Sequence, residues 1–265
     1  MTTEQYMEAS RRHEIITPEN AHELVCSPEL WNSRSGDAAV FTSRTESQIF
    51  GDIAHDYLLD NASFDAKYLV ADGPVNPKTG APYGLTTKAY ADWLATVGRP
   101  VVQTGLVPVL KSMREKYEST VRAAHDTRVV VLRRVEAVGD DVSFRPTADG
   151  ADDGLVAGAL IDCLETDGRA ALKAVDVRTT SCIENVLSGS LDELKVRLMV
   201  MELVAGCVAA IRLVEKSNPS RTLDITLSPT SRAETNDLVT RGIRNLLAGR
   251  ASGAWRNRYD GQVAI

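Results

Sequence analysis

The stretch GALIDCLETDGRAALKAVDVRTT, residues 158–180, contains two apolar runs with a polar turn between them. The first run begins slightly earlier, so the predicted strands are Leu155–Leu164 and Ala171–Val177, joined by Glu165-Thr166-Asp167-Gly168. Short apolar runs bounded by turn residues of this kind are typical of paired β-strands. The stretch therefore predicts two neighbouring strands joined by a tight turn.

Alternation along the second strand separates two sets of side chains. Asp176 and Arg178 share one face, and Lys173 points to the other. With Asp162 on the adjacent strand, two carboxylates could hold a hard divalent ion through oxygen ligands, and the cation at Arg178 would steady a phosphodiester. Spacing alone favours a second interpretation, an edge strand whose Asp and Arg side chains simply alternate outward.

The residues before this stretch have helical patterns. Thr17 followed by Pro18 predicts an N-cap and the first residue of a short helix that ends near Cys26. A second predicted helix starts near Ser43 and carries His55 on a side that need not face the core. Further helices are predicted over Lys88–Thr96 and Leu106–His125, with a loop over Asp72–Gly84.

The residues around and after the stretch complete a mixed pattern. The predicted strands are Arg128–Ala137, Val142–Arg145, Ala210–Glu215 and Thr222–Thr226, and the predicted helices are Leu191–Ala209 and Ser231–Ala248. Ser231 or Thr230 should cap the last helix, with Glu234 as the capping-box partner. This order predicts an α/β fold, a mixed β-sheet core flanked by helices with a helical N-terminal elaboration.

The composition is that of a globular protein. The chain has 265 residues, of which 43% are hydrophobic and 25% charged, and no apolar run reaches the roughly 18 residues that a membrane span needs. The N-terminus lacks the apolar segment of a secretion signal. The four cysteines have no C-x-x-C spacing, which argues against structural zinc and a disulfide scaffold. We therefore expect a cytoplasmic protein with no membrane contact.

The formal charge of −6 is unevenly distributed. Residues 1–98 hold 7 basic and 14 acidic residues, residues 148–168 hold six acids and no base, and residues 232–258 hold six arginines and two acids. An acidic cluster within a more basic half is compatible with a metal site that handles a polyanion, although solvated loops have the same composition. The charge count therefore leaves nucleic acid open as a partner.

Motifs spread along the chain resemble the PD-(D/E)XK nucleases, in particular the branch that contains RecE-type phage recombination exonucleases. The central motif is Gly158…Asp162…Val175-Asp176-Val177-Arg178-Thr179-Thr180. Upstream, Gly51-Asp52-Ile53-Ala54-His55 precedes Phe64-Asp65-Ala66-Lys67-Tyr68 in the same order as in that branch. The likeness extends from about Ser27 to Pro219.

The resemblance implies a restriction-endonuclease-like fold and a metal-dependent DNA exonuclease that cleaves one strand from linear duplex ends in phage-type recombination. It implies Asp162, Asp176 and His55 as metal ligands, Mg²⁺ or Mn²⁺ as the ion, and Arg178 as a further catalytic residue. Given a nuclease, Arg197, Arg241 and Arg244 are expected to contact DNA. A homo-oligomer, a single-strand annealing protein as partner and, for a phage-encoded chain, the host cytoplasm are also implied.

We expect one nuclease domain over residues 1–265, with a mainly helical part (1–126), an α/β core (127–249) and a tail (250–265).

Two departures from the family pattern support an alternative, a catalytically inactive module that binds DNA or protein. Arg178 stands where the family has lysine, and a guanidinium does not give up a proton at working pH. Residues 194–201 lack the family's Gln and Tyr and offer Lys195 and Arg197 instead. A structural or inhibitory phage protein is a third hypothesis.

Overall fold

A computed structural model describes residues 1–35, 45–120, 124–125, 128–138, 141–147, 154–166, 171–189, 191–216 and 221–255. Its helices are α1 (Thr3–Arg11), α2 (Ala21–Cys26), α3 (Pro28–Ser33), α4 (Glu46–Leu59), α5 (Asn61–Lys67), α6 (Lys88–Val97), α7 (Val107–Thr120), α8 (Ile183–Ser188), α9 (Leu191–Ala205) and α10 (Pro229–Ser252), with a 3₁₀ turn at Thr104–Leu106. None of the helices in this part of the chain is long and apolar enough to cross a membrane.

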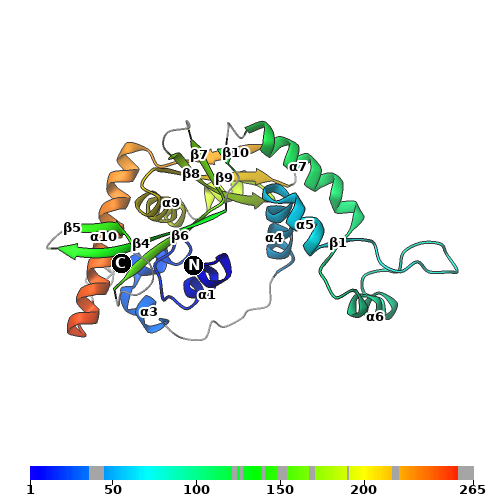
Figure 1. Cartoon of the computed structure of the whole chain (residues 1–265), viewed down its shortest axis with the longest axis horizontal. Helices are drawn as coiled ribbons and strands as arrows, with labels where there is room; N and C mark the ends of the chain where they lie inside the picture. Colours follow the sequence, from blue (N-terminus) through cyan, green and yellow to red (C-terminus); the bar gives the residue numbers. More distant parts are fainter. Residues whose placement is uncertain are drawn as a thin grey trace.

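Three sheets accompany these helices (Figure 1). The five-stranded sheet has the order β10-β9-β8-β7-β3, the three-stranded sheet β5-β4-β6, and a small parallel pair is β1-β2. The strands are β1 (Leu69–Val70), β2 (Val101–Val102), β3 (Ala124–His125), β4 (Val129–Val138), β5 (Asp141–Pro146), β6 (Val156–Ile161), β7 (Cys163–Thr166), β8 (Ala171–Thr180), β9 (Val208–Glu215) and β10 (Thr222–Ile225). The predicted class, a mixed α/β core flanked by helices, is confirmed.

Strand β8 is central because its alternating side chains enter two different cores. Ala174 packs with α9 and α10 residues in one core, whereas Val175 and Val177 pack with residues of α4 and α7 in the other. β8 runs antiparallel to β7 and parallel to β9, and the crossover between β8 and β9 contains α8 and α9. The predicted alternation along this strand is thus confirmed for the residues that pack.

The predicted strand Leu155–Leu164 is wrong in one respect, because it is two strands. β6 pairs with β4 in the three-stranded sheet, and β7 pairs with β8 in the five-stranded sheet. Asp162 is the residue between them. The turn predicted after β7 extends into Asp167 and Gly168, which lie outside the described residues. A single continuous apolar run therefore serves both sheets, which residue patterning cannot reveal.

Helix starts also differ from the predictions. Ser228, not Ser231 or Thr230, caps α10, with its hydroxyl accepting from the Ser231 amide and Pro229 occupying the first helical turn. α2 begins at Ala21 rather than at Pro18. Each region contains a proline and hydroxyl residues that allow a helix to begin at more than one position, and tertiary packing selects the position that is used.

The β9 core provides a stability test. Replacing Ile211, which is fully buried opposite Asp176 in the β8–β9 register, by alanine should lower the free energy of unfolding by about 2–5 kcal/mol because it leaves a cavity. Val208→Ala on the same strand, where Val208 is 43% exposed, should change it by less than about 0.5 kcal/mol. Urea unfolding of both variants measures the difference, and equal effects would contradict the described core.

Candidate functional site

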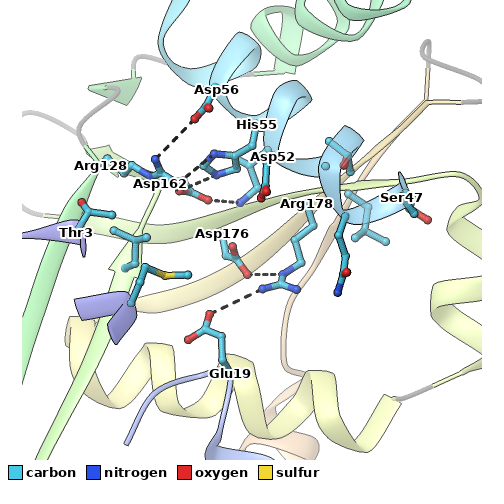
Figure 2. Close-up of a pocket in the computed structure, with 18 of the residues that line it drawn as sticks. Thr3, Glu19, Ser47, Asp52, His55, Asp56, Arg128, Asp162, Asp176 and Arg178 are labelled. Atoms are coloured by element: carbon cyan, nitrogen blue, oxygen red, sulfur yellow. Dashed lines mark hydrogen bonds and ion pairs between the residues drawn. The ribbon is translucent and has the colours of Figure 1, made fainter. Parts of the chain in front are cut away.

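A cavity of about 1010 Å³ lies between α1 and α4, with residues of β6 and β8 at its base (Figure 2). One face of α1 and one face of α4 supply just under half of its lining residues, and β8 supplies residues 176–180. The charged residues that line it are Glu4, Glu8, Arg11, Glu19, Asp52, Asp56, Lys67, Arg128, Asp162, Asp176 and Arg178, together with His55. The cavity thus collects residues from the N-terminal helices and from the central strands.

Asp162 lies at the base of this cavity, at the change of sheet between β6 and β7. It is only 3% exposed, so its carboxylate needs hydrogen-bond partners. Its Oδ2 accepts from the Val177 amide at 2.9 Å, and its own amide donates to the Val175 carbonyl. The Asp162 carboxylate therefore provides a hydrogen-bond acceptor for a backbone amide of β8, immediately before β7 begins at Cys163.

His55 on α4 faces the other oxygen of the same carboxylate. Its Nε2 is 3.0 Å from Asp162 Oδ1, and its Nδ1 is 3.3 Å from Nη2 of Arg128. A guanidinium only donates, so Nδ1 is the acceptor and Nε2 carries the proton that it donates to Asp162. Arg128 also lies 3.7 Å from Asp162 Oδ1. In this arrangement His55 and Arg128 both orient Asp162.

Asp176 on β8 is held by two arginines. Its Oδ2 accepts from Arg178 Nε at 2.7 Å and lies 3.4 Å from Arg197 Nε. Burial alone would raise the pKa of Asp176, but the charges of Arg178 and Arg197 outweigh it and hold that pKa below its ordinary value. Asp176 is therefore ionised at neutral pH.

Glu19 closes the same network from the N-terminal segment. Its Oε1 accepts from Arg197 Nη2 at 2.6 Å and lies 3.9 Å from Arg178 Nη2, while Oε2 accepts from the Tyr6 hydroxyl at 3.1 Å. Because Arg197 is 5% exposed, this second carboxylate gives a buried guanidinium a second partner. Two carboxylates and two guanidinium groups thus form a charge-neutral quartet.

The lining has an excess of negative charge, with seven carboxylates against four cationic side chains. An anionic phosphodiester would be repelled by such a cavity unless cations accompanied it. Carboxylates are also the ligands that Mg²⁺ and Mn²⁺ prefer. The lining therefore has the ligand chemistry that a hard divalent ion needs, and the assignment of Asp162 and Asp176 as its ligands stays a prediction.

Four of the predicted site residues, His55, Asp162, Asp176 and Arg178, line this one cavity. The predicted DNA contact Arg197 is instead buried against Asp176 and Glu19. Arg241 and Arg244 are on α10, which supplies none of the cavity residues in the described part of the chain, and Arg241 pairs with Asp237. The roles predicted for all seven residues stay predictions.

Two further residues of the cavity, Glu19 and Arg128, are not indicated by the sequence. Glu19 precedes its partner Arg178 by more than 150 positions, and nothing in its local pattern indicates a contact with β8. The pattern around Arg128 predicts the start of a strand and gives no signal of its contact with Asp162.

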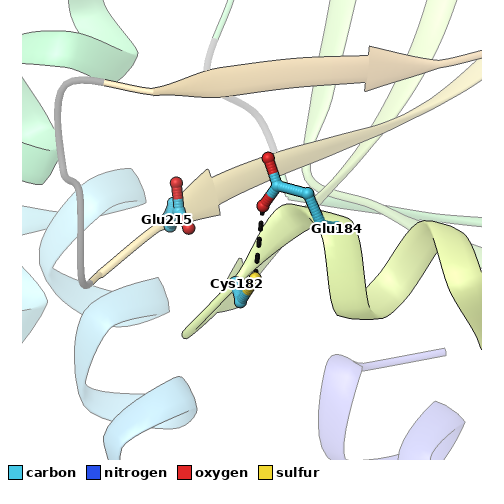
Figure 3. Close-up of side chains that lie close together, drawn as sticks. All are labelled: Cys182, Glu184 and Glu215. Atoms are coloured by element: carbon cyan, nitrogen blue, oxygen red, sulfur yellow. Dashed lines mark hydrogen bonds between the residues drawn. The ribbon is translucent and has the colours of Figure 1, made fainter.

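A second group of potential metal ligands lies elsewhere, at the ends of β8 and β9 (Figure 3). Ligand atoms of Cys182, Glu184 and Glu215 are within 4.8 Å of one another, which the set His55, Asp162 and Asp176 does not achieve among the described residues. Arg221 pairs with both glutamates of this group. Its guanidinium already provides the counter-charge, so the group is an ion-pair cluster.

No protein-family model matches the chain, and no curated protein matches it. Among solved structures it is similar to a candidate exonuclease from Eubacterium rectale, with 13% identity, a TM-score of 0.46 and coverage of 98% of this chain and 90% of that one. An alkaline exonuclease from Laribacter hongkongensis has 12% identity, a TM-score of 0.38 and coverage of 92% and 93%. Likenesses at this level establish neither a family nor an activity.

The quartet predicts a stability effect. Arg197→Met removes a buried guanidinium and leaves Asp176 and Glu19 with one counter-charge fewer, so the free energy of unfolding should fall by about 3–5 kcal/mol. Lys195→Met, on the same helix and with Asp192 as its ion-pair partner among the described residues, should change it by less than about 0.5 kcal/mol. Chemical denaturation of both variants checks this, and an Arg197→Met variant as stable as the control would refute the quartet.

Proposed function

We propose that this chain is a metal-dependent nuclease that hydrolyses phosphodiester bonds of DNA. The supporting observation is that His55 of α4, Asp162 between β6 and β7, and Asp176 and Arg178 of β8 line one cavity. The motif order along the sequence supports the finer proposal, an exonuclease that degrades one strand from linear duplex ends in phage-type recombination. Oligomerisation and an annealing partner belong to the same proposal.

In this mechanism Asp162 and Asp176 would hold Mg²⁺ or Mn²⁺, which would supply charge neutralisation and activation of water when bound. His55 keeps the Asp162 carboxylate oriented through the Nε2–Oδ1 hydrogen bond. Such supporting contacts fix the direction of a ligand. The metal-ligand role predicted for His55 itself would require its ring to exchange this bond for the ion.

Arg178 contributes charge rather than proton transfer. Its guanidinium stays protonated, and the neighbouring Asp176 raises its pKa further although burial opposes this. It can therefore stabilise negative charge on a phosphate but does not accept a proton from water. Glu19, 3.9 Å away, holds the outer edge of the same guanidinium and fixes its position.

A non-catalytic DNA- or protein-binding module is the second candidate function. The observation that favours it is that the carboxylates are already occupied: both oxygens of Asp162 have partners, and two arginines lie against Oδ2 of Asp176. An ion would have to compete with these contacts. The two experiments below separate the candidates.

Purified protein with Mg²⁺ or Mn²⁺ should degrade linear duplex DNA and spare closed circles. Asp176→Asn should lower the rate by at least about 100-fold, because loss even of a residue that supports a metal ligand costs 10–100-fold. Gel analysis of linear and circular DNA measures both effects, with Asp237→Asn on α10 as the control. Full activity of Asp176→Asn, or no cleavage by the wild type with either ion, would exclude the proposal.

Arg178→Lys tests whether the arginine is competent. If the wild type is active, the lysine variant should retain activity within about 10-fold, since both side chains supply a positive charge at this position. Initial rates on linear duplex DNA measure it. Activity that is absent in the wild type and appears only in Arg178→Lys would identify the natural chain as the inactive module.

A further inference from the structure

One part of the cavity wall departs from its acidic character. Lys67 at the end of α5 and Arg128 just before β4 both approach Asp56 on α4, with Lys67 Nζ 2.5 Å from Oδ2 and Arg128 Nη1 4.0 Å from Oδ1. The Tyr68 hydroxyl donates to the same Oδ2 at 2.8 Å. The consecutive helices α4 and α5 and the segment before β4 therefore meet at one carboxylate.

Two cations lie against the single carboxylate of Asp56, whereas the rest of the lining has six carboxylates and two cations. One of the two cations, Arg128, is shared with Asp162 at 3.7 Å. Asp56 is largely covered, with a side chain 15% exposed, but those of Lys67 and Arg128 are 53% and 43% exposed. The carboxylate is thus covered, whereas the two cations beside it are partly exposed and line the cavity.

Lys67 and Tyr68 both stay protonated at neutral pH. Burial would lower the pKa of Lys67, but its hydrogen bond and ion pair with Asp56 outweigh this and raise it. Burial, and then Asp56, raise the pKa of Tyr68. Lys67 therefore stays charged, and the Tyr68 hydroxyl stays a donor to Asp56.

We propose that Lys67 and Arg128 bind a backbone phosphate of the DNA strand next to the phosphate that is cleaved. This inference rests on the proposed nuclease function and adds a subsite to it. An ammonium keeps two donors when the third is given to Asp56, and a guanidinium presents several in one plane. Arg128 also contacts His55 and Asp162, so it links this subsite to the catalytic carboxylate.

The experiment measures binding of a fluorescein-labelled DNA duplex by fluorescence anisotropy over a range of salt concentrations. The parent is full-length Asp176→Asn with Mg²⁺, so that the duplex is not consumed. Each lysine–phosphate contact contributes about 0.9 to the slope of log affinity against log salt. Lys67→Met should weaken binding and reduce the slope by about 0.9, and Lys67→Arg should restore it.

The Asp56→Asn variant should change DNA affinity in the opposite direction from Lys67→Met. It keeps an acceptor for Tyr68 and removes the negative charge between the two cations, so binding should become tighter. A lysine that contacts no phosphate would leave the salt slope unchanged in Lys67→Met. Lys195→Met, which removes a lysine paired with Asp192 outside the cavity, is the matched control and should leave the slope unchanged.

The outcomes also distinguish the subsite from the function on which it rests. If the wild type cleaves linear DNA and the parent binds it, an unchanged slope for Lys67→Met, or weaker binding by Asp56→Asn, overturns the subsite alone. If the wild type does not cleave DNA and the parent does not bind it, the proposed function and the subsite fail together.

Discussion

The buried carboxylate of Asp162 is the constraint on which the site depends. A strand that passes from one sheet to another leaves backbone amides without partners, and such amides are costly when buried. Asp162 supplies an acceptor to the Val177 amide at this passage. Its second oxygen, Oδ1, faces the cavity and accepts a hydrogen bond from His55 of α4. A requirement of the backbone thereby fixes the position of the central candidate ligand.

On β8, the charge-neutral quartet of two carboxylates and two guanidinium groups compensates the charge of Asp176. Asp176 is ionised although it is largely covered, because Arg178 and Arg197 lie against it. Two cations around one carboxylate would in turn leave an excess of positive charge, and Glu19 restores neutrality. The arginines at positions 178 and 197 thus belong together: each arginine has a carboxylate that compensates it, and one of these carboxylates comes from the N-terminal segment.

The helices and strands of the core could be predicted from the sequence, but not all of the contacts between them. Apolar runs and turn residues predicted β8, the long helix α9 and the loop at 72–84, since these depend on local periodicity. The division of 155–164 between two sheets depends on which neighbour each half pairs with, and no local pattern records this. Within the site, motif order brought His55, Asp162, Asp176 and Arg178 to attention. Glu19 and Arg128 escaped notice because an isolated charged residue is usually a solvated surface residue.

The acidic lining of the cavity bears on how a chain with a negative net charge would bind DNA. A chain of net charge −6 that bound DNA through a cationic surface alone would need arginines and lysines without acidic partners. The predicted surface contact Arg241 is instead paired with Asp237, and Arg197 is buried. Cations at the proposed site would therefore have to come largely from solution, with Lys67 and Arg128 supplying the fixed positive charge beside them. Binding and metal dependence would then be coupled, because the same carboxylates that attract the ion repel the substrate in its absence.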